Sequence, residues 1–130
     1  MKLKSLLIIT AIFSGINGLS AMLIPEKVGL FFGIETSPSA LLAGQLAGLG
    51  SMAIALFTWL LRNTKDLKTQ HAITLTLFIV NTLGIILSVK ATFTGTMRNG
   101  WPAIGFYVIF SLVYFYFRFL KRSLVNNLPE

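Results

Sequence analysis

The chain has 130 residues, a formal net charge of +7 and a hydrophobic fraction of 55%, while only 12% of its residues are charged. Soluble domains carry about twice that charged share, and disordered chains combine high charge with low hydrophobicity, so neither class fits. With no cysteine and a single histidine, the sequence excludes a disulfide framework, thiolate catalysis, cysteine-ligated zinc and histidine-rich metal sites.

Four long windows of the sequence carry no Asp, Glu, Lys or Arg. They are Ser5–Pro25, Thr36–Leu61, Thr69–Val89 and Asn99–Phe117. Because a helix rises about 1.5 Å per residue, about 20 apolar residues cross a bilayer's hydrocarbon core. Helices of a soluble bundle would each need a polar face toward water, whereas the stretches LLIITAIF in the first window and FYVIFSLVYFYF in the fourth are apolar all round. The sequence therefore predicts an all-α integral membrane four-helix bundle that forms one domain over residues 1–130.

The first span is expected over about residues 3–24, ending before Pro25. Its basic start and apolar stretch are also typical of a secretory signal peptide. A cut after Ala21 would put Leu19 where signal peptidase requires a small residue, and the apolar run continues to Ile24. These features favour a retained helix, while a cleaved form with three spans stays open as the alternative.

The segment after Pro25 has too few apolar residues to span a membrane, so a short helix or turn at the outer interface is expected there. The remaining spans are predicted over about residues 39–61, 70–92 and 101–120. Trp59 is placed to anchor the second span at the interface, and Pro102 suits the first turn of the fourth.

Lysine and arginine are distributed unevenly between the predicted loops. Eight lie at one side of the membrane, namely Lys2, Lys4, Arg62, Lys65, Lys68, Arg118, Lys121 and Arg122, and three lie at the other, namely Lys27, Lys90 and Arg98. The positive-inside rule places both termini in the cytoplasm. This distribution accounts for the net charge, so a nucleic-acid partner is not expected. The cytoplasmic cluster is expected to contact anionic lipid of the bilayer.

Small and polar residues form one stripe along each predicted span. In the second span the stripe includes Gly44, Gly48, Ser51 and Ala55, which follow helical spacing. Glycines four residues apart let helix backbones approach closely, and hydroxyl and amide groups bond between helices. The simplest interpretation is that these residues pack the helices together.

Four polar side chains within the spans support a second hypothesis. Asn17, Gln45 and Tyr107 are predicted to lie in the outer half of the bundle, and Asn81 lies nearer the membrane centre. An unpaired amide in hydrocarbon costs several kcal/mol, so these groups need partners. The partners are either one another or a ligand, which would be a small amphiphile or lipid in a polar-lined pocket.

Catalysis is the third hypothesis, because none of the carboxylates Glu26, Glu35, Asp66 and Glu130 lies within a span and no catalytic or metal-binding motif is found. No cofactor is expected. The first hypothesis is instead a non-enzymatic accessory or scaffold subunit. Ala43, Ala47 and Gly50 form a further small-residue face on the second span, which favours association with a membrane protein or a second copy of the chain.

One run of the sequence resembles a type of small bacterial inner-membrane protein in which an outer proline and phenylalanine–glycine segment precedes a small-residue helix. The matching residues are Pro25, Phe32, Gly33, Gly44, Gly48, Trp59 and Arg62. The overall plan is similar to the DoxX-like four-helix group. The resemblance implies multi-pass location in the bacterial inner membrane and no fixed catalytic residues. Some members of that group are subunits of membrane redox complexes, but this chain has no cysteine or haem-ligand pair of its own.

Overall fold

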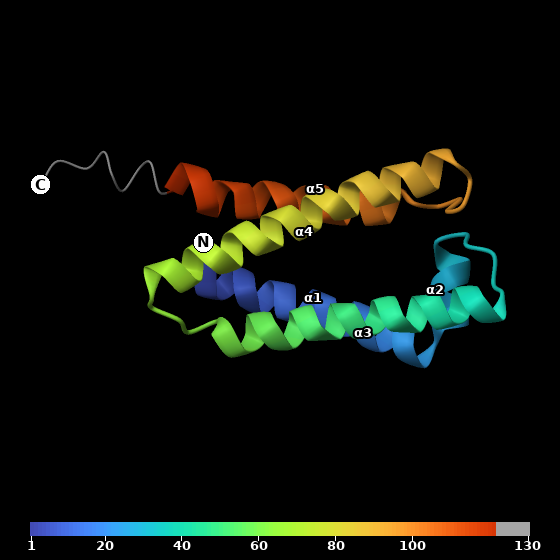
Figure 1. The fold of residues 1–130 in the computed structure, drawn as a ribbon, viewed down its shortest axis with the longest axis horizontal. Helices are drawn as coiled ribbons and strands as arrows, with labels where there is room; N and C mark the ends of the chain where they lie inside the picture. Colours follow the sequence, from blue (N-terminus) through green and yellow to red (C-terminus); the bar gives the residue numbers. More distant parts are fainter. Residues whose placement is uncertain (122–130) are drawn as a thin grey trace, which may run out of the picture. The chain divides into compact units, whose positions relative to one another are not determined.

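The computed structural model describes residues 1–121, which form helices and loops without any strand. The elements are α1 (Leu3–Leu23), α2 (Pro25–Phe31), α3 (Pro38–Leu61), α4 (Leu67–Phe93), α5 (Trp101–Phe115) and the π-helix η1 (Tyr116–Leu120) (Figure 1). Four helices are long and apolar enough to cross a membrane, with α5 and η1 together making the fourth, and they indicate an integral membrane protein. The predicted all-α class is confirmed.

The predicted spans agree with these helices within a few residues, and the largest difference is at the start of α4. This helix begins at Leu67 rather than at about residue 70. The reason is a cap, because the Asp66 carboxylate accepts a hydrogen bond from the backbone N–H of Thr69 at 2.9 Å. The polar residues before residue 70, taken from their composition as loop, therefore form the first turn of α4.

The described contacts divide the chain after Asn63 into two compact units. The first unit contains α1, α2 and α3, and the second contains α4, α5 and η1. The arrangement of all four spans as one bundle and one domain, and the cytoplasmic location of the termini, stay predictions.

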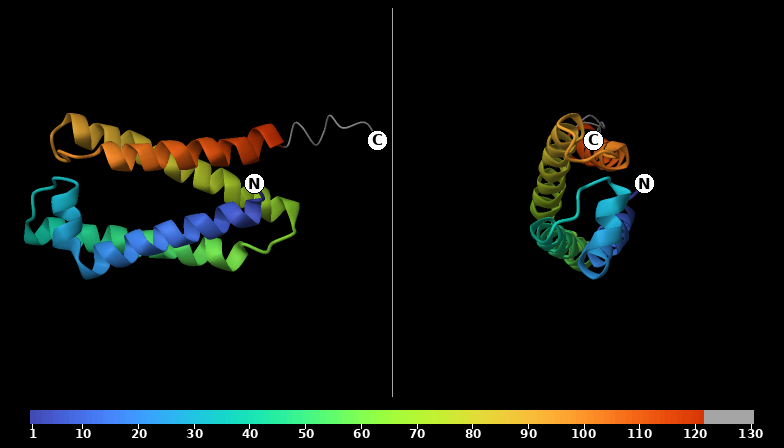
Figure 2. Two further views of the ribbon diagram at one scale, coloured as in Figure 1. Left: turned by 180° about the vertical axis from the view of Figure 1, so that it is seen from behind. Right: turned by 90° about the vertical axis from the view of Figure 1, so that its right-hand side faces the viewer.

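In the first unit α1 and α3 lie side by side and run antiparallel (Figures 1 and 2). The Asn17 side-chain amide donates a hydrogen bond to the Ser51 hydroxyl at 3.1 Å. Ala21, four residues further along α1, has its side chain against Gly48 of α3. A Cβ atom built on Gly48 would lie 2.9 Å from the Ala21 Cβ, closer than side chains normally approach. Small residues thus set the spacing of this pair.

The expected short element between the first two spans is the helix α2. Pro25 occupies its first turn, where the missing N–H costs no hydrogen bond. The helix ends at Phe31, and Gly33 in the turn after it has a φ of 66°, in the left-handed region that glycine adopts without strain. The backbone N–H of Ile34 donates to the carbonyl of Gly29 at 2.8 Å and closes this turn. Whether α2 lies at the membrane interface stays a prediction.

α3 begins with a cap and a proline. The Ser37 hydroxyl accepts a hydrogen bond from the backbone N–H of Ala40 at 3.2 Å, and Pro38 is the first residue of the helix. This combination satisfies one of the free N–H groups at the helix start and fixes the backbone for helix formation.

In the second unit α4 and α5 form an antiparallel pair joined by a short loop. The loop contains Gly95, whose φ of 77° lets the chain turn after α4. Next to the loop, the rings of Phe93 and Trp101 meet edge to face with centroids 6.5 Å apart. At mid-pair the hydroxyls of Thr82 and Ser111 share a hydrogen bond of 3.0 Å. These contacts fix the register of the two helices.

The fourth span changes from an α-helix to the π-helix η1 at Tyr116. π-Helical segments are rare and occur frequently at functional sites. Nothing in the spacing of the apolar residues predicted this change. Predicted cytoplasmic residues beyond Lys121, Arg122 among them, lie outside the described residues.

Candidate functional site

Asn17 lies on α1 and points toward α3. Its side-chain amide nitrogen donates to the Ser51 hydroxyl at 3.1 Å, which links the two helices across their interface. The side chain nevertheless remains exposed. One predicted ligand-binding residue is therefore bonded to a residue predicted to pack the helices.

Gln45 lies on α3 and reaches the other helix of the same pair. Its amide nitrogen donates to the backbone carbonyl of Met22 at 3.3 Å, near the end of α1. This side chain is also exposed. Asn17 and Gln45 are brought to one interface, but each amide nitrogen has its own partner and the two do not bond to each other.

Asn81 is buried on α4, with 7% of its surface exposed. Its amide nitrogen donates to the carbonyl of Leu77 one turn earlier, at 2.6 Å. Asparagine within a helix commonly bonds back to its own backbone in this way. The bond gives the amide nitrogen of Asn81 an acceptor within its own helix, so this nitrogen does not need a partner on a second helix.

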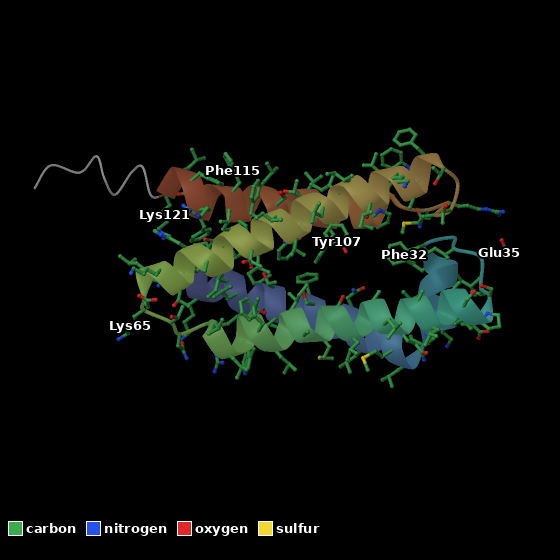
Figure 3. The ribbon with its side chains drawn as sticks, in the orientation of Figure 1. Phe32, Glu35, Lys65, Tyr107, Phe115 and Lys121 are labelled. Atoms are coloured by element: carbon green, nitrogen blue, oxygen red, sulfur yellow. The ribbon has the colours of Figure 1, made fainter. Side chains whose placement is uncertain are left out.

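Tyr107 packs its ring over Gly84, across the α4/α5 interface. A Cβ atom built on Gly84 would lie 2.6 Å from the nearest atom of that ring, so the glycine leaves the space that the ring fills. Figure 3 labels Tyr107 on α5. Of the four predicted ligand-binding residues, two lie in each helix pair, and their convergence on one pocket stays a prediction.

The residues predicted to pack α3 differ in their contacts. Gly48 lies against α1, and a Cβ atom on Gly15 of α1 would make ordinary contact with the Ala55 side chain at 3.7 Å. Ser51 accepts the bond from Asn17. A Cβ atom on Gly44 would meet nothing within 4 Å. Close approach within this pair is therefore made at Gly48 and not at Gly44.

Thr82, the residue after Asn81 on α4, was not among the predicted site residues. Its hydroxyl bonds both to the carbonyl of Phe78, at 2.8 Å, and to the Ser111 hydroxyl across the pair. Hydroxyls are common in membrane helices, so Thr82 gave no distinguishing signal. Its role is visible only once the register of α4 against α5 is known.

No group of three or more His, Cys, Asp and Glu side chains within residues 1–121 is arranged to hold a metal ion. Away from their ends, the spans instead carry neutral hydroxyls and amides. These groups can bond helices together or bind a polar ligand, but they supply no strong acid or base at membrane depth.

We found no match for this chain among protein-family models, curated proteins or solved structures.

Proposed function

We propose that this protein is a small multi-pass protein of the bacterial inner membrane that acts without catalysis, as an accessory or scaffold subunit for another membrane protein or a second copy of itself. The observation that carries the proposal is an unused small-residue face on α3. Ala43 and Ala47 are exposed, and a Cβ atom on Gly50 would meet nothing within 4 Å. This face is turned about a third of a revolution from Gly48, the residue that contacts α1.

Small residues favour helix association because they let backbones approach closely. Gly48 uses this property where it meets α1. The face formed by Ala43, Ala47 and Gly50 offers the same property a second time without a partner from α1. The resemblance of the Pro25–Arg62 region to DoxX-like proteins supports the assignment to the bacterial inner membrane.

The hydrogen bonds of the side-chain amides within the spans also favour this proposal over a ligand pocket. The amide nitrogens of Asn17, Gln45 and Asn81 all have protein partners within their own helix pair. The bonds of Asn17 and Gln45 join two helices, and bonds between helices contribute about 0.6 kcal/mol each in membrane proteins, which is consistent with a packing role.

Photo-crosslinking in the native membrane tests the proposal. A photoreactive amino acid is placed at Ala47 and, as the matched control, at Ala53, an exposed alanine on a different side of the same helix. We expect Ala47 to give a discrete crosslinked product with one protein, and Ala53 to give much less of it. Equal products at both positions, or lipid adducts alone at Ala47, would contradict the proposal.

One observation favours binding of a small amphiphile as the second candidate function. Asn17 and Gln45 are exposed, and no hydrogen bond to their side-chain oxygens is described although both lie within spans. Such oxygens need a donor in a membrane. Replacing both residues with leucine would abolish binding of an amphiphile if the pocket exists, and it would leave the crosslink at Ala47 intact if the scaffold role holds.

A further inference from the structure

Arg118 is a charged residue in η1, at the end of the fourth span. Its Nε atom is buried and has no hydrogen-bond partner among residues 1–121, and no carboxylate in this part of the chain forms an ion pair with it. The side chain as a whole is only partly buried, but buried polar atoms are nearly always bonded. The unpaired Nε therefore points to a group that the described chain does not provide.

Arg62, at the end of α3, provides a comparison, because its guanidinium has both a hydrogen-bond acceptor and a close aromatic ring within the same chain. Its guanidinium lies 3.9 Å from the centre of the Trp59 ring and also donates to the Trp59 carbonyl. Arg118 has only a longer ring contact, 5.3 Å from the centre of Phe119. The two arginines thus differ in their hydrogen bonds, because Arg62 donates to a protein carbonyl whereas the buried Nε of Arg118 has no acceptor among the described residues.

The register of α4 against α5 gives the depth of Arg118. Thr82 bonds Ser111, and the rings of Phe78 and Phe115 lie 5.6 Å apart between centroids. Continuing the antiparallel register one turn further places Arg118 at about the level of Leu75. The polar first turn of α4 ends at His71, only one turn away. Arg118 thus lies at the boundary between apolar and polar parts of the pair, where lipid phosphates are found.

The surroundings of Arg118 combine a second cation with aromatic rings. Lys121 lies three residues further on, with its ammonium 4.9 Å from the centre of the Phe117 ring. The Phe119 ring lies 4.9 Å from that of Phe115 and 5.9 Å from that of Phe78, between centroids. Figure 3 shows Phe115 and Lys121 toward the same end of this helix pair. The site therefore offers positive charge beside an apolar surface.

We propose that Arg118 and Lys121 bind the phosphate of an anionic phospholipid headgroup, and that the neighbouring phenylalanine rings contact its acyl chains. A guanidinium matches the oxygens of a phosphate in charge and geometry, and Lys121 adds a second charge. Free phosphate has the same oxyanion, but it would gain nothing from the rings. This inference does not depend on the proposed scaffold function, because it concerns the second helix pair and not the face on α3.

Lipid retention measured by native mass spectrometry tests this site. The purified full chain is mixed in detergent with phosphatidylglycerol or phosphatidylcholine, and bound lipid is counted for the wild type, Arg118→Gln and Lys121→Gln. The matched control is Arg98→Gln, an exposed arginine at the opposite end of the same pair. We expect each site variant to retain phosphatidylglycerol about fivefold more weakly, the effect of about 1 kcal/mol per basic residue. Retention of phosphatidylcholine and the control should not change.

Three results would overturn the inference. Retention of phosphatidylglycerol could be unchanged in both site variants, or it could fall equally in Arg98→Gln, which would indicate net charge alone. Excess inorganic phosphate could also displace the lipid completely, which would indicate a site for free phosphate. Thermal unfolding followed by tryptophan fluorescence checks that Arg118→Gln is folded. If it is not, Lys121→Gln, at an exposed residue, decides the outcome.

Discussion

Gly18 of α1 and Gly48 of α3 face each other with no room for a side chain on either. A Cβ atom on Gly18 would lie 2.8 Å from the Gly48 carbonyl oxygen, and one on Gly48 would lie 2.9 Å from the Gly18 carbonyl oxygen. Both obstacles are backbone atoms, which cannot rotate away as a flexible side chain would. The α1/α3 pair therefore depends on glycine at this crossing.

Replacing Gly48 with alanine should destabilise the protein by about 1–3 kcal/mol, the usual cost of overpacking a tight contact. The same substitution at Gly50, where an added Cβ meets nothing within 4 Å, is the matched control on the same helix. Thermal unfolding in detergent measures both. A loss of stability in Gly50→Ala as large as that in Gly48→Ala would show that the close crossing is not the cause.

The bond between Asn17 and Ser51 should contribute about 0.6 kcal/mol to the α1/α3 pair, the average for such bonds in membrane proteins. A double-mutant cycle with Asn17→Ala, Ser51→Ala and both together isolates this value from the other effects of each substitution. Strictly additive single effects would mean that the two side chains do not interact in the membrane.

The cap at the start of α4 should make stability depend on acid pH. The pKa of the Asp66 carboxyl lies below its ordinary value of 3.8, chiefly because the Thr69 hydroxyl donates to it, and next because the Thr69 backbone N–H does so. A carboxylate with a lowered pKa stabilises the fold fully above pH 3.8, and this contribution is lost as the pH falls through the lowered pKa.

The melting temperatures of the wild type and Asp66→Ala test this dependence. We expect a constant difference near neutral pH, and a difference that shrinks below pH 3.8. Removing the main donor with Thr69→Val should reproduce much of the effect. A difference that persists unchanged at low pH would show that the ionised carboxylate is not what stabilises the cap.

The orientation of the chain can be tested by cysteine labelling, because the sequence has no cysteine of its own. Cysteine replaces Lys65 before α4 in one variant and Thr96 after α4 in another, both at exposed positions. The excess of basic residues predicts that a membrane-impermeant reagent labels Thr96→Cys in intact cells, and Lys65→Cys only after permeabilisation. The reverse pattern would place the termini outside.

The four helices could be predicted because charge and proline mark their ends. No Asp, Glu, Lys or Arg interrupts the window from Thr36 to Leu61, and α3 occupies nearly all of it. The start of α4 was predicted less accurately because hydropathy detects only the apolar segment, whereas the helix begins earlier, directly after the Asp66 cap.

The contacts of the candidate site residues were less predictable than the helices. The partner of a polar residue depends on the register of one helix against the next, which the sequence does not show. Helical spacing placed Asn17 on a polar face, but it could not show that Ser51 faces it across the pair. Spacing likewise treated Gly44 and Gly48 alike, although only Gly48 is at the crossing. The π-helix around Arg118 has no sequence signal that we can identify, so its buried Nε atom was visible only in the structure.

Native mass spectrometry of the protein gently extracted from its own membrane tests the association role most directly. We expect the wild type and Ala53→Leu to carry a second polypeptide or a second copy of the chain at a fixed ratio, and Ala47→Leu to lose it. Lipid that is lost on Arg118→Gln belongs to the other site and does not affect this result. A monomer in all three forms, with a small amphiphile that is lost when Asn17 and Gln45 become leucine, would contradict the account and favour the pocket.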